Sequence, residues 1–393
     1  MKIAILGAGV GGLSAAIALK KKGFDIEIYE KHSNINELGA GIVCWPNASF
    51  VLDKLGILDG VKKVSGEPTE MRRLTDKGET IGSLNLLKLN ETMGYPSYSI
   101  LRRDLMNILG EHAKKLGIEI RYNAEVKSMT TRPDNLAQAH LKNGQVIEAD
   151  VFMGADGRMN SVARQYVLGN NKPVYQGFIN WVGVCECSKE IFSEMTVCDY
   201  WGVGERFGIV PVSPRKAYWA GAIASVTLAE KNPEIYKAEL LSIFKHWPAP
   251  IQMMIEETAL SKMNKIYVHD HDPIKRWHRN NVLLMGDAAH APLPTSGQGA
   301  CQALEDAWHL AQSLENNMTD INKAFHAFTS ARSDKTAGIT LGARKLASSL
   351  FNTDAAFCLE RNLNSKMMNY DDMVTGMANA WASGLGMHKH ATH

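Results

Sequence analysis

Apolar and polar positions in the first 30 residues predict a strand, a helix and a second strand. Lys2–Leu6 is mostly apolar, as in a buried strand of a parallel sheet. Leu13–Lys22 has apolar residues at helical spacing, and Phe24–Tyr29 is again strand-like. This order predicts a βαβ unit at the start of an open parallel sheet.

Two later stretches repeat this pattern. Val151–Met153 and Val282–Met285 are short apolar runs, and glycine and aspartate follow each of them closely. Helical spacing resumes after both runs, over Ser161–Tyr166 and from Gly299 onward. We therefore expect two more strands of the same sheet, with their carboxyl ends at the edge where ligands bind in open α/β folds.

Residues 67–98 and 173–273 differ because apolar and polar residues alternate there, which favours antiparallel strands. Helical spacing returns at the carboxyl end, over Ile321–Leu350 and from Asp354 to His393. The predicted fold is α/β with an α+β insert. Its parts are a discontinuous Rossmann-like domain (1–66, 99–172 and 274–330), a mainly antiparallel substrate-binding sheet domain (67–98 and 173–273) and a C-terminal helical segment (331–393).

Composition narrows the class of protein. The 393 residues include 43 Lys plus Arg and 41 Asp plus Glu. The resulting net charge of +2 is too small to give the positive electrostatic potential that attracts nucleic acid. No apolar run reaches the roughly 18 residues that a membrane span needs. The amino terminus lacks the pattern of a signal peptide, and the six cysteines form no CxxC. We expect reduced thiols, a cytoplasmic location, and a monomer or homodimer.

The loop after the first strand reads Gly7-Ala8-Gly9-Val10-Gly11-Gly12, a GxGxxG pattern. Gly7 permits the tight turn, Gly9 lets a pyrophosphate approach the backbone, and Gly12 lets helix and strand pack closely. Glu30 ends the second strand, where it would accept hydrogen bonds from an adenosine ribose. With strand, helix and acid in place, the pattern predicts dinucleotide binding.

Two other places suit an anionic ligand. Gly297-Gln298-Gly299 opens a helix, whose first N–H groups and partial positive charge favour a group that becomes negative. Arg102 and Arg103 stand at a strand-to-helix junction, where they could bind phosphate or simply be solvated surface charge. Gly39–Asn47 is glycine-rich, and we expect it to be a loop before a helix over Ala48–Leu55.

Three motifs then occur in a specific order: GAGVGG from Gly7, GADGRMNS from Gly154, and GDAAHAPLPTSGQG from Gly286. Together they resemble the single-component (class A) FAD-dependent aromatic hydroxylases over nearly the whole chain. The resemblance implies a bound FAD and a transient NAD(P)H. The cofactor-binding residues it implies are Gly7, Gly9, Gly12, Glu30, Lys31, Arg102, Val126, Asp156, Asp287, Gly297, Gln298, Gly299 and Ala300.

Within that resemblance the roles differ. The three N-terminal glycines and Arg102 would contact the pyrophosphate, Asp287 the ribityl chain, and Gly297 to Ala300 the pyrimidine end of the flavin. Asp156 would act toward both FAD and the nicotinamide cofactor. The implied reaction is hydride transfer from NAD(P)H to FAD, followed by hydroxylation of an aromatic ring through a flavin C4a-hydroperoxide. No metal is expected, and His290 is interpreted as a structural residue.

On the substrate side, Asn180, Arg206 and Tyr218 are similar to the pocket of FAD-dependent urate hydroxylase. Arg206 would favour an anionic substrate, or it could form a structural ion pair. Thr295 stands where urate hydroxylases carry an acid, which weakens the case for urate. Salicylate or hydroxybenzoate hydroxylation, modification of a drug or pigment, and a non-catalytic flavoprotein remain alternatives. O2 and an aromatic small molecule are the expected partners.

Overall fold

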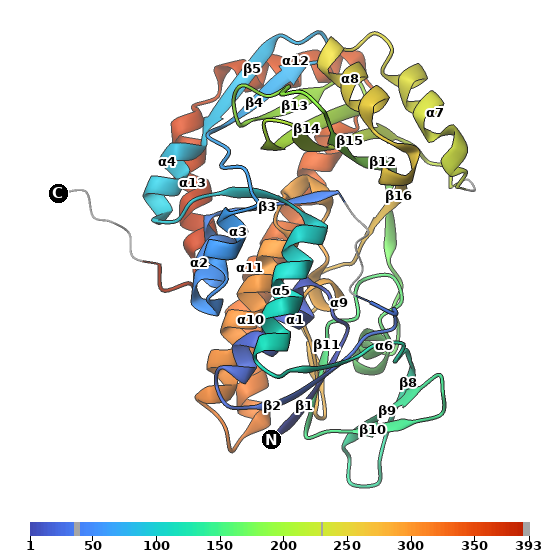
Figure 1. Cartoon of the computed structure of the whole chain (residues 1–393), viewed down its shortest axis with the longest axis vertical. Helices are drawn as coiled ribbons and strands as arrows, with labels where there is room; N and C mark the ends of the chain where they lie inside the picture. The colour runs from blue at the N-terminus through green and yellow to red at the C-terminus, as the bar shows by residue number, and fades with distance from the viewer. Residues whose placement is uncertain (35–39, 229–230, 388–393) are drawn as a thin grey trace, which may run out of the picture.

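A six-stranded sheet forms the base of the molecule in this computed structural model, which describes residues 1–34, 40–228 and 231–387 (Figure 1). Across the sheet the strands are β17 (His278–Arg279), β18 (Val282–Leu284), β11 (Val151–Gly154), β1 (Lys2–Leu6), β2 (Asp25–Tyr29) and β7 (Glu119–Arg121). All neighbours pair in parallel except β17 with β18. The predicted open α/β sheet is therefore confirmed.

Helices cover this sheet and carry its motifs. α1 (Val10–Lys20) begins directly after Gly9, three residues earlier than predicted, and packs against α5 (Arg102–Lys115) and α10 (Gly299–Glu315). On the other side of β11 lie α6 (Val162–Leu168) and a small sheet (Figure 1). That sheet consists of β8 (Val126–Thr131), β9 (Ala137–Leu141) and β10 (Val146–Glu148).

A seven-stranded sheet forms the other end of the molecule (Figure 1). Its strands come from 67–98 and 173–273, although the domain boundaries themselves stay a prediction. In order they are β16 (Met263–Asp270), β12 (Val174–Glu186), β15 (Lys216–Ala224), β14 (Glu205–Ser213), β13 (Thr196–Trp201), β4 (Glu70–Thr75) and β5 (Thr80–Asn85). Pairing is antiparallel except between β13 and β4. α7 (Tyr236–Ile243) and α8 (Ala249–Glu257) cover one face.

Two predictions for the first hundred residues were incomplete. The stretch expected to be a loop contains β3 (Gly41–Cys44), which pairs antiparallel with β6 (Tyr98–Leu101); Gly39 lies outside the described residues. α2 (Pro46–Leu55) then starts two residues earlier than expected. The stretch 67–98 also ends in a helix, α4 (Leu86–Met93). The β3–β6 ribbon lies between the two large sheets (Figure 1).

The carboxyl-terminal part is helical as predicted. α11 (Ile321–Leu350) packs along α10, and α12 (Ala355–Met367) and α13 (Tyr370–Ala382) follow it. The end of the predicted helical segment, 388–393, lies outside the described residues. Among the helices that the structure describes, none combines the length and apolar character needed to cross a bilayer. A short helix, α3 (Leu58–Lys62), packs next to α2.

Candidate functional site

A cavity of about 260 Å³ opens at the carboxyl ends of β1, β2 and β11. Seven of the predicted cofactor-binding residues line it: Gly7, Gly9, Glu30, Lys31, Arg102, Val126 and Asp156. They are spread over the sequence from Gly7 to Asp156, and the fold brings them together at one edge of the parallel sheet. We refer to this space as the dinucleotide cavity.

The glycines of this cavity have different physical roles. A side chain on Gly9 would meet no atom within 4 Å, so the backbone there faces open space that a ligand can occupy. Gly7 has φ +104°, which favours glycine, and a Cβ on Gly12 would overlap the Gly7 carbonyl oxygen. Gly12 therefore serves the packing of α1 on the strand and does not line the cavity.

Glu30 already binds the glycine loop. One carboxylate oxygen accepts a hydrogen bond from the Ala8 N–H at 2.8 Å, and the other accepts one from the His32 N–H at 2.9 Å. Glu30 is 7% exposed, and these two bonds fix its carboxylate at the rim of the cavity. The position suits an acceptor for ribose hydroxyls.

The two arginines at the β6–α5 junction separate in the structure. Arg102 lines the dinucleotide cavity, and burial lowers the pKa of its guanidinium. Arg103 instead pairs with Glu186 at 2.6 Å on the surface of the seven-stranded sheet. One of the two therefore faces the predicted phosphate position, and the other joins the two ends of the molecule.

The two motif aspartates differ in their surroundings. Asp156 accepts hydrogen bonds from the Ser161 hydroxyl at 2.5 Å and the Ala163 N–H at 3.1 Å, and burial raises its pKa. It thus caps the turn into α6 while lining the cavity. Asp287, at the start of α9 (Asp287–His290), is 3.2 Å from Arg158 Nη1 and stabilises the charged form of Arg102. It lies outside the lining of the dinucleotide cavity.

The Gly297–Gly299 loop is held from behind by a buried polar cluster. Gln298 is 1% exposed, and its side-chain oxygen accepts hydrogen bonds from Asn47 at 2.9 Å and Gln302 at 3.0 Å. The N–H groups of Gly297 and Gln298 bond to Pro294 and Ser296 within the loop, and Gly299 and Ala300 begin α10. We call this group the Arg332 cluster; it consists of Asn47, Gln298, Gln302, Glu305, Asp306, Arg332 and Lys335.

A second cavity of about 180 Å³ lies under the seven-stranded sheet. Asn180, Arg206 and Tyr218 all line it, from β12, β14 and β15 respectively. Gly297 and Thr295 line it from the opposite side. The structure thus brings the predicted substrate residues together against the second glycine-rich loop, and we call this space the ring cavity.

Arg206 combines both of the alternatives considered for it. It lines the ring cavity, and its Nε also donates to Asp199 Oδ1 at 2.7 Å. Asp199 is a cavity residue that sequence reasoning missed. Its proximity to Arg206 depends on the antiparallel register of β13 against β14, in which Trp201 pairs with Arg206.

Tyr218 is wedged against the β3–β6 ribbon. A Cβ on Gly41 would overlap its ring, so the absence of a side chain there sets the ring position. Burial raises the pKa of Tyr218 well above its usual value, so the phenol stays protonated. The hydroxyl is therefore able to donate a hydrogen bond at any physiological pH.

Thr295 and Trp45 join the loop to the rest of the cavity. The Thr295 hydroxyl donates to the Ala343 carbonyl at 2.9 Å, so it ties the loop to α11. Trp45 Nε1 donates to the Gly297 carbonyl at 2.9 Å, which fixes the loop from the ribbon side. Neither side chain supplies a negative charge at the position where urate hydroxylases are expected to carry an acid.

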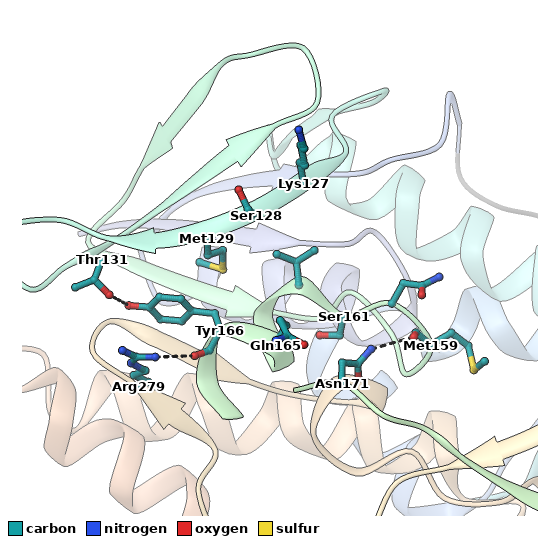
Figure 2. Close-up of a pocket in the computed structure, with 12 residues that line it drawn as sticks. Lys127, Ser128, Met129, Thr131, Met159, Ser161, Gln165, Tyr166, Asn171 and Arg279 are labelled. Atoms are coloured by element: carbon teal, nitrogen blue, oxygen red, sulfur yellow. Dashed lines mark hydrogen bonds between the residues drawn. The ribbon is translucent and has the colours of Figure 1, made fainter. Parts of the chain in front are cut away.

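A larger cavity, of about 600 Å³, lies elsewhere, between β8 and α6 (Figure 2). Tyr166 lies beneath β8 in this view, its hydroxyl bonded to Thr131, and Arg279 donates to its backbone carbonyl. None of the predicted cofactor-binding or substrate residues lines this cavity. Size alone therefore does not locate the site that the motifs define.

His290 is embedded in the protein. Its Nε2 is 2.6 Å from Asp306, and its ring packs on Trp277 with centroids 5.3 Å apart. Among the residues described by the structure, no group of three or more His, Cys, Asp and Glu side chains is arranged to hold a metal. The contacts of His290 fit the structural role predicted for it.

The fold and the two cavities define a dinucleotide-binding protein of the Rossmann-like class with a separate, sheet-covered ligand cavity. The chain belongs to the FAD binding domain family, whose model matches residues 1–331. It is 31% identical over 375 residues to the aurachin C monooxygenase/isomerase of Stigmatella aurantiaca, covering 94% of this chain and 95% of that protein. It is 32% identical over 352 residues to an FAD-dependent urate hydroxylase of Mycolicibacterium vanbaalenii, covering 88% of this chain and 87% of that protein.

A solved structure agrees over the full fold. Klebsiella pneumoniae HpxO complexed with FAD and uric acid superposes with a TM-score of 0.89 at 28% identity, covering 98% of this chain and 97% of that one. The resemblance to the class A aromatic hydroxylases is thus confirmed. The chain is a flavoprotein monooxygenase that uses FAD.

Proposed function

We propose that this monooxygenase hydroxylates an aromatic or N-heteroaromatic small molecule in the ring cavity. One observation carries the proposal: Gly297, from the loop expected at the pyrimidine end of the flavin, lines the same cavity as Asn180, Arg206 and Tyr218. A ring placed there would lie beside the reactive part of the cofactor. The relatives named urate hydroxylase support a heteroaromatic substrate.

The residues present fit FAD. The open space at Gly9 and the acceptor at Glu30 suit the adenosine and pyrophosphate, with Arg102 to balance the phosphate charge. Asp287 and the Gly297–Ala300 backbone would hold the ribityl chain and the flavin ring. When bound, FAD supplies the redox chemistry, in which NAD(P)H is the hydride donor and O2 the source of the transferred oxygen atom.

The chain's own residues would orient the substrate and exclude water from it. Apolar side chains such as Phe178, Val210 and Phe351 wall the ring cavity and exclude water from the ring. The Tyr218 hydroxyl and the Asn180 amide offer hydrogen bonds that fix its orientation. The terminal nitrogens of Arg206 can donate to a ring oxygen and so favour the build-up of electron density on it.

The test uses the purified holoprotein. NADH and NADPH oxidation in air is followed with urate, hydroxybenzoates, salicylate, hydroxypyridines and hydroxyquinolines, and the product is analysed after reaction under ¹⁸O2. We expect a flavin spectrum and one compound class that stimulates oxidation and gains one labelled oxygen. Labelled product from a variant with Asn180→Ala should fall sharply while its flavin content is unchanged.

Two results would contradict the proposal. One is a flavin-loaded protein whose NAD(P)H oxidation no compound stimulates, which would favour a non-catalytic flavoprotein. The other is stimulated oxidation that yields only hydrogen peroxide and no labelled product with every compound.

A further inference from the structure

The ring cavity contains a fixed carboxylate beside its arginine. Asp199 is 5% exposed, and its two oxygens have different partners: Oδ1 accepts from Arg206 Nε at 2.7 Å and Oδ2 from Trp201 Nε1 at 2.8 Å. The two bonds hold the carboxylate in place, because rotation toward another partner would break both. Asp199 therefore stays within ion-pair distance of Arg206.

The pair leaves the ring cavity without net charge. Among the lining residues, all of which belong to the described part of the chain, Asp199 and Arg206 are the charged ones. An anionic ligand would introduce a charge that nothing in the lining balances, since attraction to Arg206 is offset by repulsion from Asp199. The free energy needed to remove the anion from water would then not be fully offset by contacts in the cavity.

Arg206 nevertheless keeps donors for a neutral ligand. Its bond to Asp199 uses the Nε–H, and a guanidinium has four further N–H groups on its terminal nitrogens. A ring carbonyl or phenol oxygen can accept from these. Asn180 offers both a donor and an acceptor, and so suits a ring that carries an N–H next to a carbonyl.

We propose that the Asp199–Arg206 pair makes this enzyme select an uncharged ring substrate, one that carries a carbonyl or hydroxyl group and no carboxylate. This inference rests on the proposed function and narrows its substrate class. It also replaces the expectation, drawn from Arg206 alone, of an anionic substrate. By this reasoning urate, a monoanion at neutral pH, is disfavoured.

The test compares probes of equal shape that differ in charge. Salicylamide is paired with salicylate, and 3-hydroxybenzamide with 3-hydroxybenzoate. For any compound that stimulates NAD(P)H oxidation, the carboxamide and the carboxylate derivative of its ring form a further pair. Dissociation constants come from the change in flavin absorbance on titration of the holoenzyme. The wild type should bind each amide about tenfold or more tightly than its acid.

Variants at Asp199 separate charge from shape. Asp199→Asn keeps the size of the side chain and removes its charge, so this variant should bind each acid more tightly than the matching amide. Asp199→Glu keeps the charge and should still bind the amides more tightly. Asp334→Asn, on the exposed face of α11, is the matched control and should leave the ratio unchanged. Flavin content and thermal midpoint are recorded for each variant.

Two outcomes would overturn the inference and leave the proposed function standing. One is a wild type that binds or turns over acids better than amides. The other is an Asp199→Asn variant that weakens both members of a pair equally, which would assign Asp199 to positioning alone. A failure of the proposed function looks different, since then no compound stimulates NAD(P)H oxidation at all.

Discussion

At the scale of single residues, side chains at the dinucleotide cavity bind the protein itself as well as facing the ligand position. Glu30 bonds to Ala8 and His32, and Asp156 bonds to Ser161 and Ala163. The sequence located these acids because each follows a strand at a fixed distance. It could not locate Asp199, because that residue reaches Arg206 only through the register of two strands.

Replacing Asp287 should weaken FAD binding. Asp287→Ala removes the expected acceptor for the ribityl hydroxyls, and loss of a charge-assisted hydrogen bond of about 1.5–3 kcal/mol corresponds to roughly 10- to 100-fold in affinity. Flavin retained after gel filtration measures the effect. Asp334→Ala, exposed on α11, should retain its flavin like the wild type. Full retention by Asp287→Ala would exclude the assigned contact.

His309 should make stability depend on pH. Burial lowers its pKa from 6.5 to about 4. The unfolded chain therefore binds more protons than the folded chain between these values, so stability rises with pH from about 4 to 6.5 and is lost as pH falls through that window. The effect is on the order of 3 kcal/mol. Urea denaturation of His309→Gln should show a flatter profile, whereas His246→Asn, at an exposed histidine, should match the wild type.

At the scale of elements, sequence prediction succeeded where spacing alone decides. α11 was predicted at its observed bounds, because apolar residues recur at helical spacing throughout. β16 lies in the stretch expected to form antiparallel strands but lacks a regular alternation, because its buried positions include Lys265 and Asp270, which pair with Glu239 and Arg344. β3 was missed because its partner strand lies more than 50 residues away.

The Arg332 cluster links α10 to α11. Arg332 is fully buried and lies 2.6 Å from Glu305 and 2.7 Å from Asp306, whose pKa it helps to lower to about 2. Arg332→Met would leave two buried carboxylates short of a partner, a loss of about 3–5 kcal/mol. Urea denaturation measures this, and Glu305→Gln offers a milder variant if Arg332→Met does not accumulate. Arg132→Met, at a surface pair, should change stability by less than about 1 kcal/mol.

At the scale of the whole molecule, the ring cavity depends on contact between the ribbon and the seven-stranded sheet. Gly41→Ala would place a methyl group where the Tyr218 ring lies, so the ring or the ribbon must move. We expect a KM for the aromatic substrate raised about tenfold, with flavin content preserved. Gly338→Ala, in open space on α11, is the control and should be neutral or slightly stabilising. An unchanged KM in Gly41→Ala would contradict this contact.

The strand order of the six-stranded sheet also determines when the molecule can fold. β18 pairs with β11, and its residues are made some 130 positions after those of β11. Until residue 284 has left the ribosome, the backbone edge of β11 has no parallel neighbour on that side, and α10 is not yet available to cover α1. A nascent chain that ends within the seven-stranded sheet therefore carries an open strand edge, which is a template for aggregation. Fragments cut before β18 should need a chaperone to stay dispersed, although they contain the whole GxGxxG loop.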